Sequence, residues 1–202
     1  MKYKDIDKDK TAFIFELDDV LFPAKDYLYQ VYYLFANMLE YVELVDAKQT
    51  TNLMAATYIA EGANAVFHRL AESLPIVEKY KVNFNDLIVT AKLPLKLLLY
   101  QNMLTLLQDI VANNKKLFIV TNGDVDLQYN KIKQVEWHKL EHNLTCYFAN
   151  ETAHKPASDV LHLLMEDHNL QSKDLLIIGR SLTDKLYAEA AGIDYIPVDK
   201  FL

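Results

Sequence analysis

Short, uninterrupted apolar segments alternate with segments of helical periodicity along much of this 202-residue chain. Continuous apolar runs are typical of strands that are covered on both faces, and their alternation with helices is typical of a parallel sheet. The pattern therefore predicts an α/β fold with a doubly wound, mainly parallel five-stranded sheet. We expect the strands at residues 12–15, 116–120, 146–149, 175–178 and 195–198.

The segment between the first two expected strands is far longer than the roughly one dozen residues that a crossover needs. Apolar residues recur there at three- and four-residue spacing, which predicts one helix over residues 28–45 and a second over residues 53–74, closed by Pro75. A third helix is expected after Pro94, packed back on the sheet. We therefore expect an inserted helical cap domain at residues 22–92 and a core domain at residues 1–21 and 93–202.

Four polar signatures follow the expected strands in a fixed order. Each begins at or just after the carboxyl end of an apolar run, with Lys155 a few residues further on, and this is where open α/β sheets bind their ligands. Each signature alone is common in proteins, so their order and spacing carry the weight. They are Glu16-Leu17-Asp18-Asp19-Val20-Leu21, Thr121-Asn122-Gly123, Lys155-Pro156 and Gly179-Arg180-Ser181-Leu182-Thr183-Asp184.

In this order and spacing, the signatures resemble those of the haloacid dehalogenase superfamily, most of whose members are magnesium-dependent phosphatases. The resemblance covers residues 11–20 and 116–198 and is to the phosphatase type with a helical cap on a Rossmann-like core. It implies transfer of a phosphoryl group to a carboxylate, followed by hydrolysis of the acyl phosphate. It also implies a small phosphorylated molecule or inorganic phosphate as the ligand.

The resemblance assigns catalytic roles to residues of the first three signatures. Glu16 stands at the position of the nucleophile, and Asp18 at that of the general acid and base. The hydroxyl of Thr121 would hold a phosphate oxygen. Lys155 would neutralise the phosphate and the attacking carboxylate.

The same resemblance assigns binding roles to other residues of these signatures. Main-chain N–H groups near Asn122 and Gly123 would hold the phosphate. Asp184, together with the carboxylates of the first signature, Glu16 and Asp18, would position Mg²⁺, the implied cofactor. Arg180 stands where the family has a second metal-binding aspartate, and we expect it to contact the substrate instead.

Two departures from the family pattern put catalysis in question. Glu16 replaces an aspartate and carries its carboxylate about 1 Å further out, a misplacement that can cost on the order of a hundredfold in rate. Arg180 removes a metal ligand and adds a permanent cation. Two unit charges about 4 Å apart repel by roughly 4 kcal/mol at an effective dielectric constant near 20. We therefore expect magnesium binding to be weakened or lost.

The two departures also suggest a compensation. Glu16, Asp18 and Asp184 with Lys155 and Arg180 carry the same net charge as the family's aspartates and lysine with their Mg²⁺. We hypothesise that a Glu16–Arg180 ion pair occupies the place of the aspartate–magnesium unit. The alternative is an Arg180 side chain that extends into solvent.

Three functions remain open on the sequence alone. The first is a degenerate phosphatase, or pseudoenzyme, that retains a phosphate-binding crevice but hydrolyses little or nothing. The second is a working phosphatase for a small phosphorylated metabolite. The third is a non-catalytic interaction protein that reuses the fold. Dehalogenation is not expected, because it also depends on the aspartate that is missing at Glu16.

Several other polar or aromatic residues have simpler explanations than a functional role. His138 and His142 are four residues apart on an expected helix, but no third metal ligand is evident. His154, next to the catalytic lysine, could touch a leaving group or be a loop histidine. Tyr29 and Tyr33 lie off the apolar face of the first cap helix and could line a crevice, meet a partner or simply be partly exposed.

Composition excludes several classes of protein. The formal net charge of -7, without a basic stripe, argues against a general nucleic-acid binder. The amino-terminal residues alternate Lys and Asp and do not form a signal peptide, and no apolar run is long enough for a membrane span. Cys146, the single cysteine, is expected to be a buried structural thiol. We therefore expect a cytoplasmic protein.

Overall fold

The computed structural model describes all 202 residues, which divide into two compact units. The sheet unit comprises Met1–Ala24, Leu97–Tyr129 and Val135–Leu202. The helical unit comprises Lys25–Lys96 and Asn130–Gln134. Helix α6 (Val125–Gln134) thus contributes to both units.

The sheet unit is built on a five-stranded sheet in the order β5-β3-β1-β6-β7, in which all neighbouring strands are parallel. The α/β fold predicted from the sequence is therefore confirmed. The strands are β1 (Ala12–Phe15), β3 (Lys116–Thr121), β5 (Leu144–Phe148), β6 (Leu175–Gly179) and β7 (Asp194–Pro197). A separate parallel pair joins the two-residue strands β2 (Leu97–Leu98) and β4 (Val135–Glu136).

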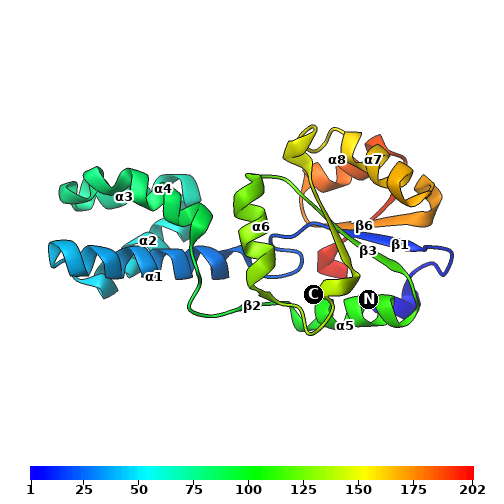
Figure 1. Cartoon of the computed structure of the whole chain (residues 1–202), viewed down its shortest axis with the longest axis horizontal. Helices are drawn as coiled ribbons and strands as arrows, with labels where there is room; N and C mark the ends of the chain where they lie inside the picture. Colours follow the sequence, from blue (N-terminus) through cyan, green and yellow to red (C-terminus); the bar gives the residue numbers. More distant parts are fainter. The chain divides into compact units, whose positions relative to one another are not determined.

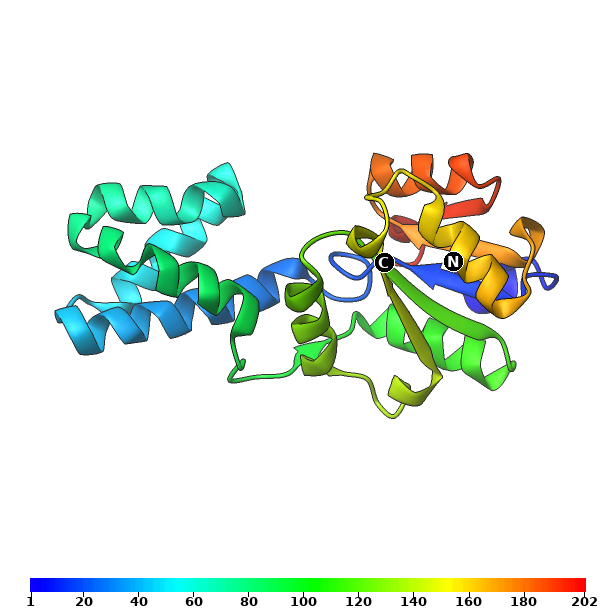
Figure 2. The ribbon, with the colours of Figure 1, turned by 45° about the horizontal axis from the view of Figure 1, so that its top comes forward.

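Helices cover both faces of the sheet. Helix α5 (Gln101–Ala112) lies on one face, while α7 (Asp159–His168) and α8 (Leu182–Ala190) lie on the other (Figures 1 and 2). Because successive side chains of a strand point to opposite faces, Ile14 packs with α7 and α8 in one apolar core. Burial on both faces explains why β1 and β6 read as uninterrupted apolar runs.

The topology favours a ligand site beyond the end of the central strand. The chain moves from β1 to β3 and β5 on one side and then returns to β6 and β7 on the other. In open α/β sheets, the crevice lies beyond the carboxyl ends of the strands where this reversal occurs. Glu16 is the first residue after β1.

The helical unit has its own apolar core, rich in aromatic rings. The ring centroid of Phe84 lies 5.0 Å from that of Phe35 and 5.3 Å from that of Phe67. Aromatic contacts of this kind add to the free energy gained by burial. The helices of this unit are α1 (Ala24–Glu43), α2 (Ala47–Glu61), α3 (Ala63–Ser73) and α4 (Lys81–Thr90).

Three expectations about helices differ from the structure. The second cap helix is in fact two helices, because Gly62 has φ = 85°, which α-helical residues do not adopt. Helix α4 was not expected. His138 and His142 do not share a helix: His138 has φ = 52° after β4, and His142 lies in a short 3₁₀ segment.

Short 3₁₀ segments complete the structure. They are η1 (Tyr3–Asp5), η2 (Pro75–Tyr80), η3 (Glu141–Asn143), η4 (Ala149–Glu151), η5 (Ser172–Asp174) and η6 (Val198–Lys200). None of the helices combines the length and the apolar character that a bilayer crossing requires.

Candidate functional site

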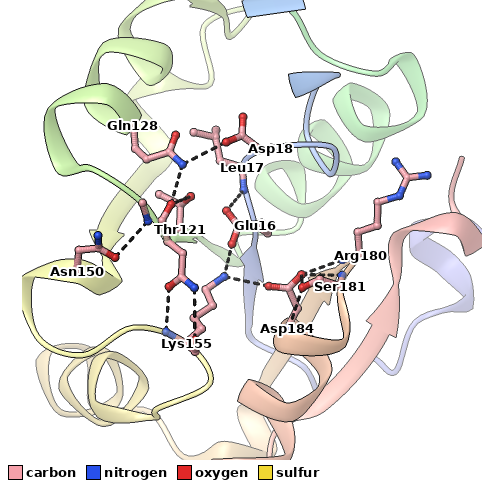
Figure 3. Close-up of polar contacts among 12 residues, drawn as sticks. Glu16, Leu17, Asp18, Thr121, Gln128, Asn150, Lys155, Arg180, Ser181 and Asp184 are labelled. Carbon is pink, nitrogen blue, oxygen red and sulfur yellow. Dashed lines mark hydrogen bonds and ion pairs between the residues drawn. The ribbon is translucent and has the colours of Figure 1, made fainter. Parts of the chain in front are cut away.

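The end of β1 presents Glu16 to the crevice. Its main-chain N–H donates to Ile178 O at 3.2 Å, so the chain is still held against β6 at this point. The carboxylate oxygen Oε1 accepts a hydrogen bond from the N–H of Leu17 at 2.8 Å, and Oε2 accepts one from Lys155 Nζ. Both oxygens of this side chain are therefore engaged inside the protein (Figure 3).

Lys155 links two signatures that are far apart in the sequence. Its side chain is only 3% exposed, and its ammonium contacts Glu16 Oε2 and, at 3.1 Å, Asp184 Oδ1. The ammonium also lies 5.3 Å from the ring centroid of Tyr187, within the range of a cation–π interaction. The expected cation of the crevice is thus a buried counter-ion of both carboxylates.

Asp184 is fixed at the start of α8. Its Oδ2 accepts hydrogen bonds from Arg180 N at 3.0 Å, Ser181 N at 3.0 Å and Ser181 Oγ at 2.8 Å. Ser181 in turn accepts from the Asp184 N–H, which completes a capping box. Burial opposes ionisation of this carboxyl, but Lys155 and the donors of Ser181 and Arg180 outweigh it, so the pKa of Asp184 lies below its ordinary value.

Gly179 makes this arrangement possible. A Cβ atom at residue 179 would lie 2.5 Å from Asp184 Cβ, which is closer than two non-bonded carbon atoms can approach. The glycine of the fourth signature is therefore required by packing, whatever the chemistry of the site.

The loop after β3 carries the second signature. Asn122 ties this loop to the third signature, because its Oδ1 accepts from Lys155 N at 2.9 Å. The N–H of Gly123 donates to Asn150 Oδ1 at 3.2 Å. Thr121 is buried, and its hydroxyl has a long contact of 3.3 Å to Asn122 O.

Gln128, one turn into α6, positions Asp18. Its Nε2 donates to Asn122 O at 2.7 Å and to Asp18 Oδ2 at 3.2 Å. Both neighbours are acceptors, so the amide orientation is fixed by chemistry. Gly123 has φ = 113°, and a Cβ atom there would lie 3.2 Å from Gln128 Nε2. A glycine in the second signature therefore lets this amide approach the loop.

Arg180 does not pair with Glu16, so that hypothesis is wrong. Its Nη2 lies 3.2 Å from Asp199 Oδ1, and its Nη1 donates to Asp19 O at 3.2 Å. The side chain is 45% exposed. Lys155 already neutralises Glu16 in the buried part of the site, and the guanidinium retains hydration at the rim.

The signatures meet around an open pocket of about 340 Å³ in the sheet unit. Its lining carries four carboxylates, those of Glu16, Asp18, Asp19 and Asp184, and one cation, Arg180. Lys155 adds a second positive charge through its contacts with Glu16 and Asp184. The site residues predicted from the sequence that line it are Glu16, Asp18, Asn122, Arg180 and Asp184.

Three residues around the crevice were missed by the sequence analysis. Gln128 and Asn150 are amides outside any signature, and Tyr187 lies within α8 with its ring next to Lys155. None of the three belongs to a signature that would mark it in the sequence. Tyr187 is fully buried, and its hydroxyl has no hydrogen-bond partner.

Other candidate residues are outside the crevice. His154 is exposed, and no bond to the carboxylates involves it. Tyr33 is 52% exposed, while Tyr29 packs with its ring centroid 5.8 Å from that of Tyr58 in the helical unit. Cys146 is half-buried in β5, and burial raises the pKa of its thiol to about 11, which keeps it protonated and unreactive at neutral pH.

As placed, the oxygens of Glu16 and Asp184 are bonded to protein donors, an arrangement that differs from that of a magnesium ligand set. Mg²⁺ requires near-octahedral oxygen ligands at about 2.0–2.1 Å. The oxygens of Glu16 and Asp184 instead accept hydrogen bonds from N–H, O–H and ammonium groups. No group of three or more His, Cys, Asp or Glu side chains is arranged to hold a metal ion.

Comparison with known proteins resolves the family. The model of the haloacid dehalogenase-like hydrolases matches residues 13–198. The chain belongs to this family. Family members usually use Mg²⁺. No relative of the chain is found among curated proteins.

Solved structures share the fold of this haloacid dehalogenase-like protein over most of its length. A family hydrolase of subfamily IA from Geobacter sulfurreducens is 18% identical, with a TM-score of 0.58 over 94% of this chain and 87% of that one. YfnB from Bacillus subtilis, whose structure is bound to magnesium, is 17% identical, with a TM-score of 0.59 over 92% and 85%. A hydrolase from Streptococcus pneumoniae is also 17% identical, with a TM-score of 0.55 over 93% and 92%.

Proposed function

We propose that this haloacid dehalogenase-like protein binds inorganic phosphate or a small phosphorylated molecule and hydrolyses phosphate monoesters weakly or not at all. The observation that carries the proposal is the engagement of both Glu16 carboxylate oxygens, by Leu17 N and Lys155 Nζ. A nucleophile must place a free lone pair in line with phosphorus at about 3–3.5 Å. These two bonds fix the direction of the carboxylate, so attack requires that the remaining lone pair of one oxygen point along the line to phosphorus.

Anion binding is supported by the donors that converge on the crevice. The Lys155 ammonium supplies a buried positive charge, and the N–H of Leu17 donates to the other oxygen of the same Glu16 carboxylate. Charge-assisted hydrogen bonds of this kind are about twice as strong as neutral ones. Arg180, at the rim of the pocket, offers a second cation to an anionic ligand.

Magnesium binding is proposed to be weak. Asp184 Oδ2 already accepts three hydrogen bonds, and Asp184 Oδ1 contacts the Lys155 ammonium. At residue 180, where the family supplies an anionic ligand, this chain has a guanidinium whose charge opposes that of a metal ion. Each effect lowers the affinity for a divalent cation.

One observation favours a working phosphatase as the second candidate. Gln128 holds Asp18 Oδ2 at 3.2 Å at the edge of the pocket, so the side chain expected to act as general acid and base is positioned. A glutamate is also chemically able to attack phosphorus. Rotation of the Glu16 side chain is then the step that decides between the two candidates.

Hydrolysis of a generic aryl phosphate separates these candidates. We expect the unmodified protein to show turnover near background with or without Mg²⁺. The double variant Glu16→Asp/Arg180→Asp should gain magnesium-dependent turnover of about a hundredfold or more, because it returns the nucleophile to position and restores the metal ligand. Robust magnesium-dependent turnover by the unmodified protein would refute the proposal.

The same preparations test for ligand binding. Phosphate that binds only the folded state raises the melting temperature, and above Kd the rise grows with the logarithm of the phosphate concentration. The absence of any such effect, in a protein that is folded, would favour the interaction-protein alternative.

A further inference from the structure

Three donors of the crevice each hold an oxygen of the protein itself. Leu17 N donates to Glu16 Oε1 at 2.8 Å, and Lys155 Nζ contacts Glu16 Oε2. Gly123 N donates to Asn150 Oδ1 at 3.2 Å. Figure 3 shows the Glu16 carboxylate between the amide above it and the ammonium below it.

These three groups are the ones that a bound oxyanion would use. Main-chain N–H groups in tight turns and a buried ammonium are standard oxyanion donors. A carboxylate offers them two oxygens and a negative charge, as one edge of a phosphate group does. At Leu17 N and Lys155 Nζ, Glu16 therefore satisfies, from within the chain, the electrostatic demand that a phosphate would satisfy, while Asn150 Oδ1 occupies Gly123 N.

We propose that Glu16 is an internal competitor for the anion site, so that an oxyanion binds only by displacing the Glu16 carboxylate from Leu17 N and Lys155 Nζ. This inference rests on the proposed function, because it assumes that the crevice binds phosphate. It assigns to Glu16 a role in regulating ligand access. The glutamate sets the affinity of the crevice for anions.

The relative support of the two carboxylates shows which one would move. Asp184 Oδ2 accepts three hydrogen bonds from Arg180 and Ser181, and its side chain is 5% exposed. Glu16 has two bonds, and its side chain is 14% exposed and lines the pocket. Glu16 is therefore the carboxylate that an incoming anion can displace, while Asp184 keeps Lys155 paired.

The same arrangement makes the test practical. Removal of the Glu16 side chain leaves Lys155 with its contact to Asp184 at 3.1 Å, so the ammonium is not buried without a partner. The variant Glu16→Ala is expected to fold. It opens the Leu17 amide and half of the Lys155 ammonium to a ligand.

Isothermal titration with inorganic phosphate measures the competition. We expect Glu16→Ala to bind phosphate at least about tenfold more tightly than the unmodified protein, since displacement of the carboxylate no longer opposes binding. Glu16→Gln, which loses the charge but keeps the volume, should lie between the two. Adding Lys155→Met to Glu16→Ala should abolish the gain, because the gain depends on the freed ammonium.

The matched control is Asp19→Asn, which removes one negative charge from the lining of the same pocket. Asp19 Oδ1 accepts from Ala24 N, and an asparagine oxygen can keep that bond. We expect phosphate affinity to rise by no more than about threefold, as befits a partly exposed and screened charge. A gain in phosphate affinity equal to that of Glu16→Ala would show that the effect comes from the net charge of the pocket. It would then refute the proposed competition by Glu16.

The outcomes also separate this inference from the proposed function. If the unmodified protein binds phosphate as tightly as Glu16→Ala does, the internal competition is refuted and the anion site stands. If folded Glu16→Ala binds no phosphate at millimolar concentration, the anion site itself is refuted. Phosphate affinity that rises from the unmodified protein through Glu16→Gln to Glu16→Ala, with no rise when Lys155→Met is added, supports both the anion site and the internal competition.

Discussion

The crevice has two corners that share one lysine and differ in how firmly each holds its carboxylate. At the Asp184 corner, a glycine, a capping serine and the start of α8 surround the acid, and every oxygen has a partner. At the Glu16 corner, a longer acid at the end of β1 folds back on its own following amide. The first corner is a piece of helix architecture, whereas the second depends on one flexible side chain.

This difference shows which departures from a family pattern a fold can accept. Residue 184 is needed for the capping box at the start of α8 as well as for any ligand, so packing alone constrains it. Glu16 and Arg180 contribute little to the backbone of their elements. The residues at these two positions can be replaced once the chemistry that required an aspartate there is no longer needed.

The largest expected effect comes from removing the firmly held acid. Asp184→Ala leaves the N–H groups of Arg180 and Ser181 and the Ser181 hydroxyl without their acceptor, and Lys155 with only one counter-ion. The loss of one member of a buried ionic cluster costs about 3–5 kcal/mol. We expect the free energy of unfolding, measured by chemical denaturation, to fall by that amount.

The matched comparison is Glu16→Ala in the same assay. Only the Leu17 amide and part of the Lys155 ammonium lose a partner, and because Glu16 itself lines the pocket, water can take the place of its carboxylate. The expected cost is about 1 kcal/mol. Equal losses for the two variants would contradict the view that the corners differ in support.

A smaller effect on the free energy of unfolding is expected when the pH is lowered. Lys155, Ser181 and Arg180 hold the pKa of Asp184 below the ordinary aspartate value, so this group contributes stability above its unfolded pKa of about 3.9. That contribution is lost as the pH falls through the lower, folded pKa. The free energy of unfolding, followed from pH 7 downward, should decline in this acid window with a slope of at most about 1.4 kcal/mol per pH unit from this group.

Asp184→Asn is the control for this acid dependence. The difference in unfolding free energy between the unmodified protein and the variant should be constant near neutral pH and shrink below about pH 4. A difference that stays constant through the acid window would show that Asp184 has the same pKa folded and unfolded.

Much of the sheet unit could be predicted because its strands are apolar and the three central ones, β1, β3 and β6, are buried on both faces. Such burial leaves uninterrupted apolar runs, and all five were located within two residues of their observed bounds. The helical unit was predicted less well. The break at Gly62 depends on one backbone angle, and α4 buries only Phe84, so neither leaves a strong periodic signal.

The site shows the same division. Convergence of the four signatures followed from where parallel strands end. The partner of Arg180 could not be predicted in this way, because Asp199 follows the last strand and belongs to no signature. Gln128 and Asn150 were missed for a related reason: a neutral amide at a helix or loop position has no pattern that marks it before its neighbours are known.

The smallest expected effect comes from Tyr187, whose ring lies next to the lysine that both corners share. The Tyr187 ring lies 5.3 Å from the Lys155 ammonium, but its buried hydroxyl has no partner, and burial raises the pKa of this phenol. Tyr187→Phe keeps the ring and removes a polar group whose burial costs about 1–3 kcal/mol when it is unpaired. The free energy of unfolding should therefore stay the same or rise slightly, and Tyr187→Leu, which also loses the ring, should lower it. A clear loss in Tyr187→Phe would mean that the hydroxyl stabilises one of the two carboxylates, and the contrast between the corners would then depend on Tyr187 as well as on Lys155.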